Sequence, residues 1–367
     1  IRKTDSKMVY MQRALELAKE AVGISSPNPP VGAVLVKDSH IVGEGHTLPP
    51  GQAHAEIIAI TQAGRAANGS SLYTTLEPCC HFGKTPPCTA QIIEAGIKEV
   101  HVAFIDPNPL VDGKGLAELR NAGIHIYVDG VDQEDAEIMD GYVKVMSSGN
   151  PFVIAKFAMS LDGKISTSSG DSKWITSSDS RAMARKLRGK VDGVIVGIGT
   201  VLQDDPYLTA RDAEGNLYDR QPVRIVLDSY GRLPLDAKLL KEPGVSLVIT
   251  TSIEEQKANS LTDLGAEVIS VSGQNGLVDL TELMKLLTQR GFLSVMVEGG
   301  SQVLGSFFDT GLVDKVVGFV SPVILGGSES PSPVGGDGAV KISDSFRLER
   351  SKITTVGSDV MITGYLR

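Results

Sequence analysis

A histidine, a glutamate and every cysteine of the chain fall within one short stretch. His54 and Glu56 form a His-x-Glu, and Cys79, Cys80 and Cys88 follow in the same segment. Imidazole nitrogen and thiolate sulfur are the ligands that zinc prefers. Three protein ligands leave the fourth tetrahedral position for water, and a nearby carboxylate that is not a ligand can carry protons. The stretch therefore predicts a catalytic zinc site.

The same residues also have an ordinary structural explanation, because cysteines are often small buried hydrophobes and helix histidines are common. The combination favours a metal site, since His-x-Glu, Pro-Cys and a later cysteine form the set that zinc deaminases use. The usual two-residue gap between the cysteines is absent, and Cys80 competes with Cys79 as a ligand. Gly83, Pro86 and Pro87 let the intervening loop fold back.

Composition narrows the class of protein. A chain of 367 residues is long enough for two domains, and a net charge of −9 disfavours a nucleic-acid partner. A small-molecule substrate is therefore expected. An odd count of three cysteines is typical of a reducing compartment, which predicts a cytoplasmic protein. The sequence contains no run of about 18 apolar residues, so a membrane span is not expected, and no signal peptide is visible.

Hydrophobic periodicity predicts two consecutive α/β domains, residues 1–147 and 151–367, separated by Ser-Ser-Gly-Asn-Pro. In the first domain, His54 and Glu56 begin a helix and point toward the sheet end where Cys79 arrives. Its helices are predicted at 6–22, 54–66, 89–95, 115–122 and 132–147, and its strands at 31–37, 41–45, 72–76, 99–105 and 124–128.

In the second domain, two glycine-containing turns each follow a strand and precede a helix, at 197–200 and 297–301. Such turns let a phosphate approach the backbone, although a tight turn alone explains them equally well. Neither is a G-x-G-x-x-G, so an ordinary dinucleotide-binding Rossmann domain is not expected. Strands are predicted at 152–158, 193–197, 223–227, 246–250, 267–271, 294–297, 353–356 and 360–366, helices at 178–188 and 280–290, and a mobile loop at 326–338.

Several charged residues lie at predicted element ends, where charged side chains are usually just solvated. They are Lys156, Asp162, Arg188, Asp204, Arg211 and Glu298. The single tryptophan, Trp174, sits in a polar segment and could stack on a ligand ring or cover a core edge.

Longer motifs make the chain resemble the bifunctional deaminase–reductase family of riboflavin biosynthesis. In the first half these are NPPVGAV (28–34), HAE (54–56), EPCCHFGKTPPC (77–88) and DPNP (106–109). In the second half they are SLDGKI (160–165), WIT (174–176), VGIGT (196–200), DDP (204–206) and VEGG (297–300). The resemblance covers nearly the whole chain.

This resemblance implies an α/β fold with a cytidine-deaminase-like three-layer α/β/α domain followed by a dihydrofolate-reductase-like α/β domain. The first would hydrolytically deaminate 2,5-diamino-6-ribosylamino-4(3H)-pyrimidinone 5′-phosphate. The second would use NADPH to reduce the ribosyl group to ribityl, giving 5-amino-6-ribitylamino-uracil 5′-phosphate. The family also suggests a homo-oligomer, a dimer or tetramer.

Carried onto this chain, the resemblance assigns one zinc to His54, Cys79 and Cys88, and makes Glu56 the proton carrier. Substrate-binding positions of the deaminase half would be Asn28, Lys84 and Asn108. Many relatives carry a histidine where this chain has Thr47, with His46 next to it, so the resemblance does not carry that histidine's contact over to this chain.

In the reductase half, the matching NADPH positions are Ala158, Trp174, Thr200, Asp204, Ser229 and the loop Gly299, Gly300, Ser301, Gln302, Val303, Leu304 and Gly305. Substrate positions are Ser172, Arg188, Leu208, Arg211 and Glu298, with Arg188 and Arg211 suited to the phosphate. Lys156, Asp204 and Glu298 would lie beside the reacting ribose carbon as catalytic groups.

Two other functions fit parts of the chain. One is a single-function NADPH reductase whose first half is a structural zinc module, and the other is a non-catalytic nucleotide-binding protein. Glu56 argues against the structural module, because such a site needs no proton carrier.

Overall fold

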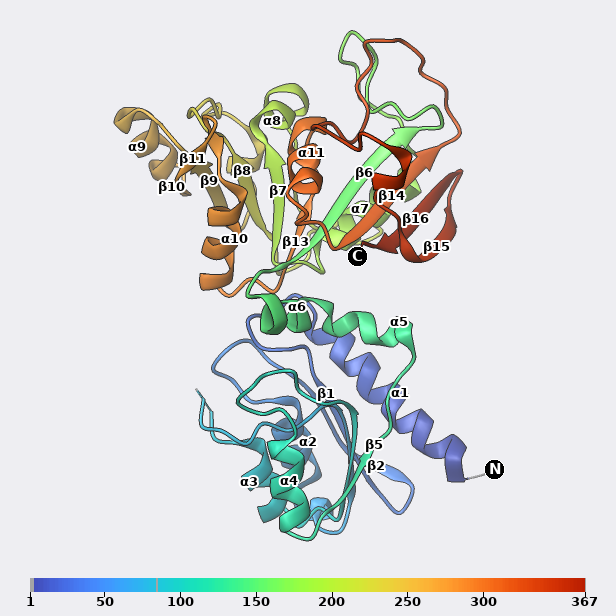
Figure 1. Ribbon diagram of the computed structural model, residues 1–367. Helices are drawn as coiled ribbons and strands as arrows, with labels where there is room; N and C mark the ends of the chain where they lie inside the picture. The colour runs from blue at the N-terminus through green and yellow to red at the C-terminus, as the bar shows by residue number, and fades with distance from the viewer. Residues whose placement is uncertain (1–2, 84, 367) are drawn as a thin grey trace. The chain divides into compact units, whose positions relative to one another are not determined.

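The computed structural model describes residues 3–83 and 85–366 (Figure 1). The chain divides between Gly149 and Asn150 into two compact units. Each unit has a main sheet of its own, and each is described by itself below.

The first unit is built on a five-stranded sheet in the order β2-β1-β3-β4-β5. β1 runs antiparallel to β2 and β3, whereas β3, β4 and β5 are parallel. Its strands are β1 (Gly32–Lys37), β2 (His40–His46), β3 (Ser71–Leu76), β4 (Glu99–Phe104) and β5 (His125–Val128). Its helices are α1 (Lys3–Ala21), α2 (Ala55–Ala63), α3 (Cys88–Glu94), α4 (Lys114–Asn121), α5 (Gln133–Ala136) and α6 (Asp140–Ser148), with 3-10 turns η1 (Gly64–Ala67) and η2 (Glu137–Met139).

Helices cover both faces of this sheet, as alternation along β1 requires. Val34 packs with Met11 and Leu15 of α1 on one face. On the other face, Gly43 and Gly45 of β2 lie under α2, and α2, α3 and α4 follow one another across that face (Figure 1). The unit therefore has three layers.

The second unit is built on a nine-stranded sheet in the order β10-β9-β8-β7-β13-β6-β14-β16-β15. The strands from β10 to β14 in this order are parallel, and the hairpin of β15 and β16 adds two antiparallel strands at the end of the sheet. Its strands are β6 (Phe152–Ser160), β7 (Gly193–Gly197), β8 (Val223–Leu227), β9 (Ser246–Thr250), β10 (Ala266–Ser270), β13 (Ser294–Val297), β14 (Lys315–Ser321), β15 (Glu349–Val356) and β16 (Asp359–Tyr365), besides the small hairpin of β11 (Gly273–Gln274) and β12 (Leu277–Val278). Its helices are α7 (Ser178–Arg188), α8 (Ile198–Asp204), α9 (Glu255–Asp263), α10 (Leu280–Gln289) and α11 (Ser301–Asp309), with 3-10 turns η3 (Lys238–Leu240) and η4 (Ile342–Asp344).

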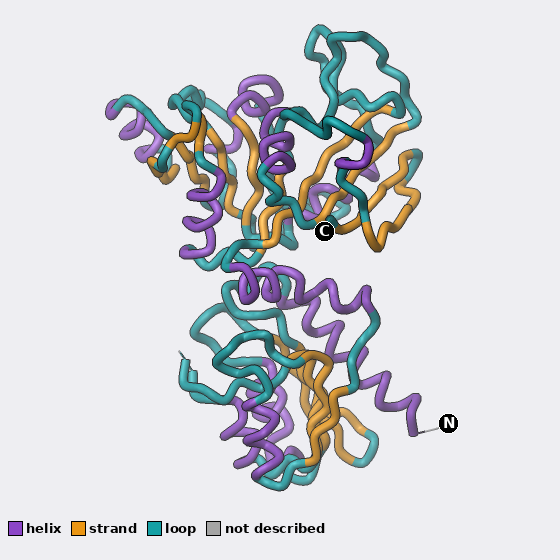
Figure 2. The backbone as a smooth tube through the Cα atoms, in the orientation of Figure 1, coloured by secondary structure: helices purple, strands orange, loops and turns teal. Residues whose placement is uncertain are grey.

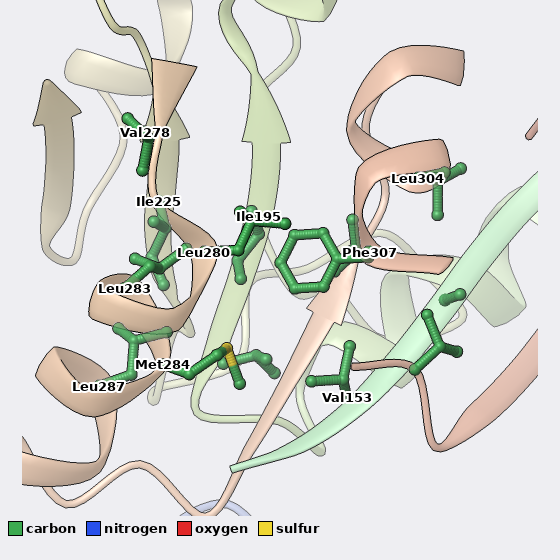
Figure 3. Close-up of a cluster of buried hydrophobic side chains, with 14 of the residues drawn as sticks. Val153, Ile195, Ile225, Val278, Leu280, Leu283, Met284, Leu287, Leu304 and Phe307 are labelled. Atoms are coloured by element: carbon green, nitrogen blue, oxygen red, sulfur yellow. The ribbon is translucent and has the colours of Figure 1, made fainter. Parts of the chain in front are cut away.

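Adjacent residues of the parallel strands enter different cores. Ile195 packs with Leu283 of α10 and Phe307 of α11 on one face (Figure 3). Its neighbour Val194 joins the opposite core, which includes Leu261 of α9. Burial on both faces explains why these strands read as continuous apolar runs.

The sequence-based predictions missed one strand and drew one helix wrongly. The strand β14 was missed, and its central glycine is a residue that counts against a strand. In the structure Gly318 pairs with Phe157 of β6, whose ring lies against the space that a side chain there would fill. The helix predicted at 132–147 is instead α5, η2 and α6, and the 3-10 turn brings buried Met139 inward.

Two long loops of the second unit lie side by side (Figure 2). The segment after β6 bonds to the segment after β14 through Ile165 N to Pro331 O at 3.0 Å and Lys164 Nζ to Ser330 O at 2.9 Å. The glycine-rich residues 326–338 lie here and contain neither helix nor strand. Among the described residues, no helix combines the length and apolar character needed to cross a membrane.

Gly43→Ala should destabilise the first unit, because its Cβ would lie 2.1 Å from the backbone oxygen of Ala59 in α2. We expect a loss of about 1–3 kcal/mol, the usual cost of overpacking, measured as a lower unfolding temperature by calorimetry. Ile41→Ala on the exposed end of the same strand is the control. Equal unfolding temperatures for Gly43→Ala and the wild type would contradict this packing.

Candidate active sites

Three metal-binding side chains converge in the first unit. Ligand atoms of His54, Cys79 and Cys88 all lie within 4.8 Å of one another. His54 Nδ1 is 3.3 Å from Cys88 Sγ and 3.6 Å from Cys79 Sγ. A nitrogen and two sulfurs at such separations suit one tetrahedral zinc.

Three different elements bring these donors together. His54 directly precedes α2, Cys79 follows β3, and Cys88 opens α3. Thr85 Oγ1 lies 3.4 Å from His54 Nε2, which leaves Nδ1 facing the sulfurs. The hydrogen bond with Cys88 lowers the pKa of the Cys79 thiol, although burial opposes it. A thiolate is the form that binds metal.

Cys80 does not join this cluster. Its sulfur lies 3.8 Å from the carbonyl oxygen of Leu110, and the metal-binding group consists of His54, Cys79 and Cys88. The competition between Cys79 and Cys80 that the sequence left open is thus resolved by geometry.

Glu56 is buried in the first turn of α2, next to the metal-binding cluster. Burial raises the pKa of its carboxyl to about 7. A group that ionises near neutral pH both accepts and releases protons readily.

A cavity of about 280 Å³ opens on this cluster. Of the residues predicted from the sequence, Asn28, His54, Glu56, Cys79 and Asn108 line it, whereas Cys88 lies behind and is fully buried. Lys84 falls outside the described residues. Thr47 also lines the cavity, and its hydroxyl oxygen accepts a hydrogen bond from Val31 N at 3.2 Å.

Sequence reasoning missed a buried carboxylate that supports this wall. Glu77 accepts hydrogen bonds from the backbone nitrogens of Asp106, Gly113 and Leu116 at 3.2, 2.9 and 3.1 Å. It thereby ties the segment before Cys79 to the loop that carries Asn108. The acidic residue of Glu-Pro-Cys was visible in the sequence, but its partners were not.

Tyr142 and Asp106 were missed as well. The Tyr142 hydroxyl donates to Asp106 Oδ1 at 2.9 Å, and both residues line the cavity. Asp106 stood in the quoted Asp-Pro-Asn-Pro motif, whereas nothing in the pattern around Tyr142 pointed to the site.

The second unit holds a larger cavity of about 1050 Å³. It forms at the carboxyl ends of parallel strands, which is where open α/β sheets bind ligands. Predicted residues on its wall are Lys156, Ala158, Ser172, Trp174, Arg188, Thr200, Asp204, Leu208, Arg211, Glu298, Gly300, Ser301, Gln302, Val303 and Leu304.

Three predicted cofactor residues are not among those that line this cavity: Ser229, Gly299 and Gly305. Ser229 Oγ accepts a hydrogen bond from Val278 N at 3.2 Å. A Cβ on Gly299 would lie 2.6 Å from Val196 Cα, and one on Gly305 would lie 2.4 Å from Gly335 C. These two glycines permit close backbone contact that shapes the wall.

A buried carboxylate with two cations lies on the wall of the larger cavity. Glu298 accepts from Arg188 at 2.5 and 3.0 Å and from Lys156 Nζ at 3.3 Å. Burial by itself would raise the pKa of Glu298, but Arg188 and Lys156 outweigh it and lower the pKa to about 2. Glu298 is therefore ionised at neutral pH.

Asp204, the last residue of α8, lies on the same wall. Its Oδ1 accepts from Ser172 Oγ at 2.7 Å, and its carbonyl accepts from Lys173 Nζ at 2.8 Å. These bonds hold the loop before Trp174 against α8.

Comparison with known proteins agrees with both sites. The profile described as the cytidine and deoxycytidylate deaminase zinc-binding region matches residues 4–104, and that of the RibD C-terminal domain matches residues 151–362. The riboflavin biosynthesis protein RibD of Aquifex aeolicus is 42% identical over 353 residues, 96% of either chain.

Solved structures agree as well. RibD of Acinetobacter baumannii superposes with a TM-score of 0.87 at 36% identity, covering 99% of both chains. A deaminase/reductase of Thermotoga maritima superposes with a TM-score of 0.86 at 35% identity over 100% of both chains.

The folds and sites define a bifunctional enzyme in which a zinc-binding deaminase precedes a dihydrofolate-reductase-like reductase. The chain belongs to the RibD family of riboflavin biosynthesis proteins. The predicted fold class and bifunctional activity are confirmed, and the reductase belongs to an NADPH-dependent family.

Cys88→Ser should lower the zinc content after dialysis from about one ion per chain toward zero, because a site with two protein ligands binds zinc with much lower affinity than a site with three. Metal analysis of the purified protein measures this. Cys80→Ser should keep its zinc, because Cys80 faces Leu110. Zinc loss in Cys80→Ser with retention in Cys88→Ser would reverse the ligand assignment.

Glu298→Gln should destabilise the protein at neutral pH but hardly at low pH. The folded pKa of about 2 lies below the ordinary 4.5, so the carboxylate stabilises the fold above pH 4.5 and this contribution fades as pH falls toward 2. The difference in unfolding temperature between wild type and variant should shrink from pH 7 to about pH 3. Glu255→Gln, at an exposed position in the first turn of α9, is the control and should show no such trend. A difference that grows on acidification would contradict the ion cluster.

Proposed function

We propose that the chain performs two consecutive reactions on one phosphorylated pyrimidine, the deamination in residues 1–147 and the reduction in residues 151–367. The Thermotoga relative is described as a diaminohydroxyphosphoribosylaminopyrimidine deaminase and 5-amino-6-(5-phosphoribosylamino)uracil reductase. The observation that carries the proposal is the three-ligand cluster with buried Glu56 at the wall of a cavity.

The first reaction replaces an exocyclic amino group by oxygen from water and releases ammonia. His54, Cys79 and Cys88 would hold a zinc ion, which when bound would supply hydroxide at neutral pH by lowering the pKa of water from 15.7 to about 7. Glu56 takes up the proton of the attacking water and delivers it to the leaving amino nitrogen. Asn28 and Asn108 on the cavity wall orient the pyrimidine through hydrogen bonds.

The second reaction converts the ribosyl group to ribityl, the product being 5-amino-6-ribitylamino-uracil 5′-phosphate. NADPH, when bound, supplies the hydride. The wall formed by Ala158, Trp174, Thr200 and residues 300–304 would hold it, where Gly300 leaves room at the start of α11 for a phosphate to approach the backbone.

The reduced ribose carbon also needs a proton on its neighbouring nitrogen or oxygen. Glu298 cannot give it at neutral pH, because Arg188 and Lys156 keep this carboxyl ionised. Lys156 carries N–H donors and lines the same cavity. We therefore assign proton donation to Lys156, with Glu298 holding it in place and Asp204 orienting the loop of Ser172.

A homo-oligomeric enzyme in the cytoplasm completes the proposal. The strand β15 ends the nine-stranded sheet with most of its residues exposed, and such an edge can pair with another chain. Three free cysteines are compatible with a reducing compartment.

Glu56→Gln should abolish deamination, with a loss of at least about 100-fold, the usual contribution of a positioned proton carrier. Reduction of supplied deaminated intermediate by NADPH should remain at the wild-type rate, because Glu56 lies in the other unit. Ammonia release and NADPH absorbance measure the two steps separately.

Glu94→Gln, an exposed change at the end of α3, is the matched control and should retain both activities. Full deamination by Glu56→Gln would assign the proton transfer to another group. Loss of both reactions in Glu56→Gln would show that the two sites are not independent.

A further inference from the structure

Four arginines gather on one wall of the larger cavity. Arg181, Arg185 and Arg188 lie on one face of α7, since residues spaced by four and three in a helix are neighbours. Arg211 joins them from the segment after α8, and all four line the cavity. Like charges at such spacing repel one another, so the cluster needs anions.

Three of these arginines have protein partners. Arg188 bonds to Glu298 and to the Thr209 carbonyl. Arg211 bonds to Glu242, Thr209 Oγ1 and the Gly215 carbonyl, at 3.0–3.3 Å.

Arg181 is held in a different way. Its Nη1 donates to the Thr176 carbonyl at 2.5 Å, and its guanidinium lies 4.5 Å from the ring centre of Trp174.

Arg185 differs from the other three. Its Nε is shielded from solvent and has no hydrogen-bond partner, and no ion pair to its side chain occurs among residues 3–83 and 85–366. Burial and the neighbouring Arg181, Arg188 and Arg211 lower its pKa. A guanidinium remains charged in proteins, so this side chain is a cation without a counter-charge.

We propose that Arg185 binds the phosphate of the pyrimidine substrate in the reductase site, an inference that rests on the proposed function. Guanidinium groups bind phosphate with paired, charge-assisted hydrogen bonds. A phosphate beside Arg185 would supply the missing acceptor for Nε and offset the repulsion within the cluster.

The position on α7 favours the substrate over the cofactor as the source of this phosphate. Arg185 lies three residues before Arg188, which is about 5 Å along the helix axis. Arg188 bonds to Glu298, which the proposed function places beside the reacting carbon. The substrate phosphate sits at the opposite end of a five-carbon chain from that carbon. The proposed cofactor phosphate site lies instead at the start of α11.

The test compares Arg185→Gln with wild type on 5-amino-6-(5-phosphoribosylamino)uracil and on the same compound without its phosphate. For the phosphorylated substrate we expect KM to rise roughly 10- to 100-fold, as for loss of a hydrogen bond to a charged group. The KM for NADPH should stay unchanged. On the dephosphorylated compound, wild type and variant should be equal.

The matched control is Lys186→Gln, an exposed cation on the next residue of α7, which should behave as wild type. Inorganic phosphate should raise the unfolding temperature of the wild type but not of Arg185→Gln. Without ligand, the variant should unfold no earlier than the wild type, because an unpaired cation is removed.

Several results would overturn the assignment. A raised KM for NADPH alone would move Arg185 to the cofactor phosphate, and equal losses on both forms of the pyrimidine would make its role purely structural. If inorganic phosphate raised the unfolding temperatures of variant and wild type equally, phosphate binding by Arg185 would also be excluded. Lack of any turnover by the wild type would overturn the proposed function instead, and the phosphate measurement would still decide on Arg185.

Discussion

A charge removed from water must meet an opposite charge or a set of polar groups, and both sites of this enzyme are arranged under that constraint. In the reductase unit, Glu298 is buried between Arg188 and Lys156. In the deaminase unit, the sulfurs of Cys79 and Cys88 lie beside the imidazole of His54, a donor set that a divalent metal would complete. Charged side chains in these places would be costly without their partners, so the geometry of each site follows from the matching of its charges.

The two sheets provide the places where such groups can meet. In the deaminase unit, β3 and the helices α2 and α3 end or begin at one edge of the sheet, so residues far apart in sequence become neighbours there. In the reductase unit, residues in or directly after the carboxyl-terminal halves of the parallel strands β6, β7, β13 and β14 line one cavity. The helices on both faces bury the strands and keep these ends rigid, which a site that must hold two ligands in register requires.

Sequence patterns were sufficient for the elements with strong periodicity and for residues in compact motifs. His54, Glu56, Cys79 and Cys88 could be grouped because zinc chemistry restricts residue types and order. β14 could not be predicted, because the packing of Phe157 over Gly318 is a contact between distant strands. The same holds for Glu77 and Arg185. Their residue types are visible in the sequence, but what matters is which partners surround them, and that depends on the folded chain.

Glu77 has a consequence for how variants of this enzyme are interpreted. Its one carboxylate accepts hydrogen bonds from the backbone nitrogens of Asp106, Gly113 and Leu116. Glu77 therefore connects the segment before Cys79 to the loop that carries Asn108. A Glu77 substitution would disturb the segment of Cys79 and the loop that carries Asn108 together, although Glu77 is not one of the three metal-binding residues. In a genetic screen it would be scored as an inactivating lesion of the catalytic centre, although the fault lies in the scaffold beneath it.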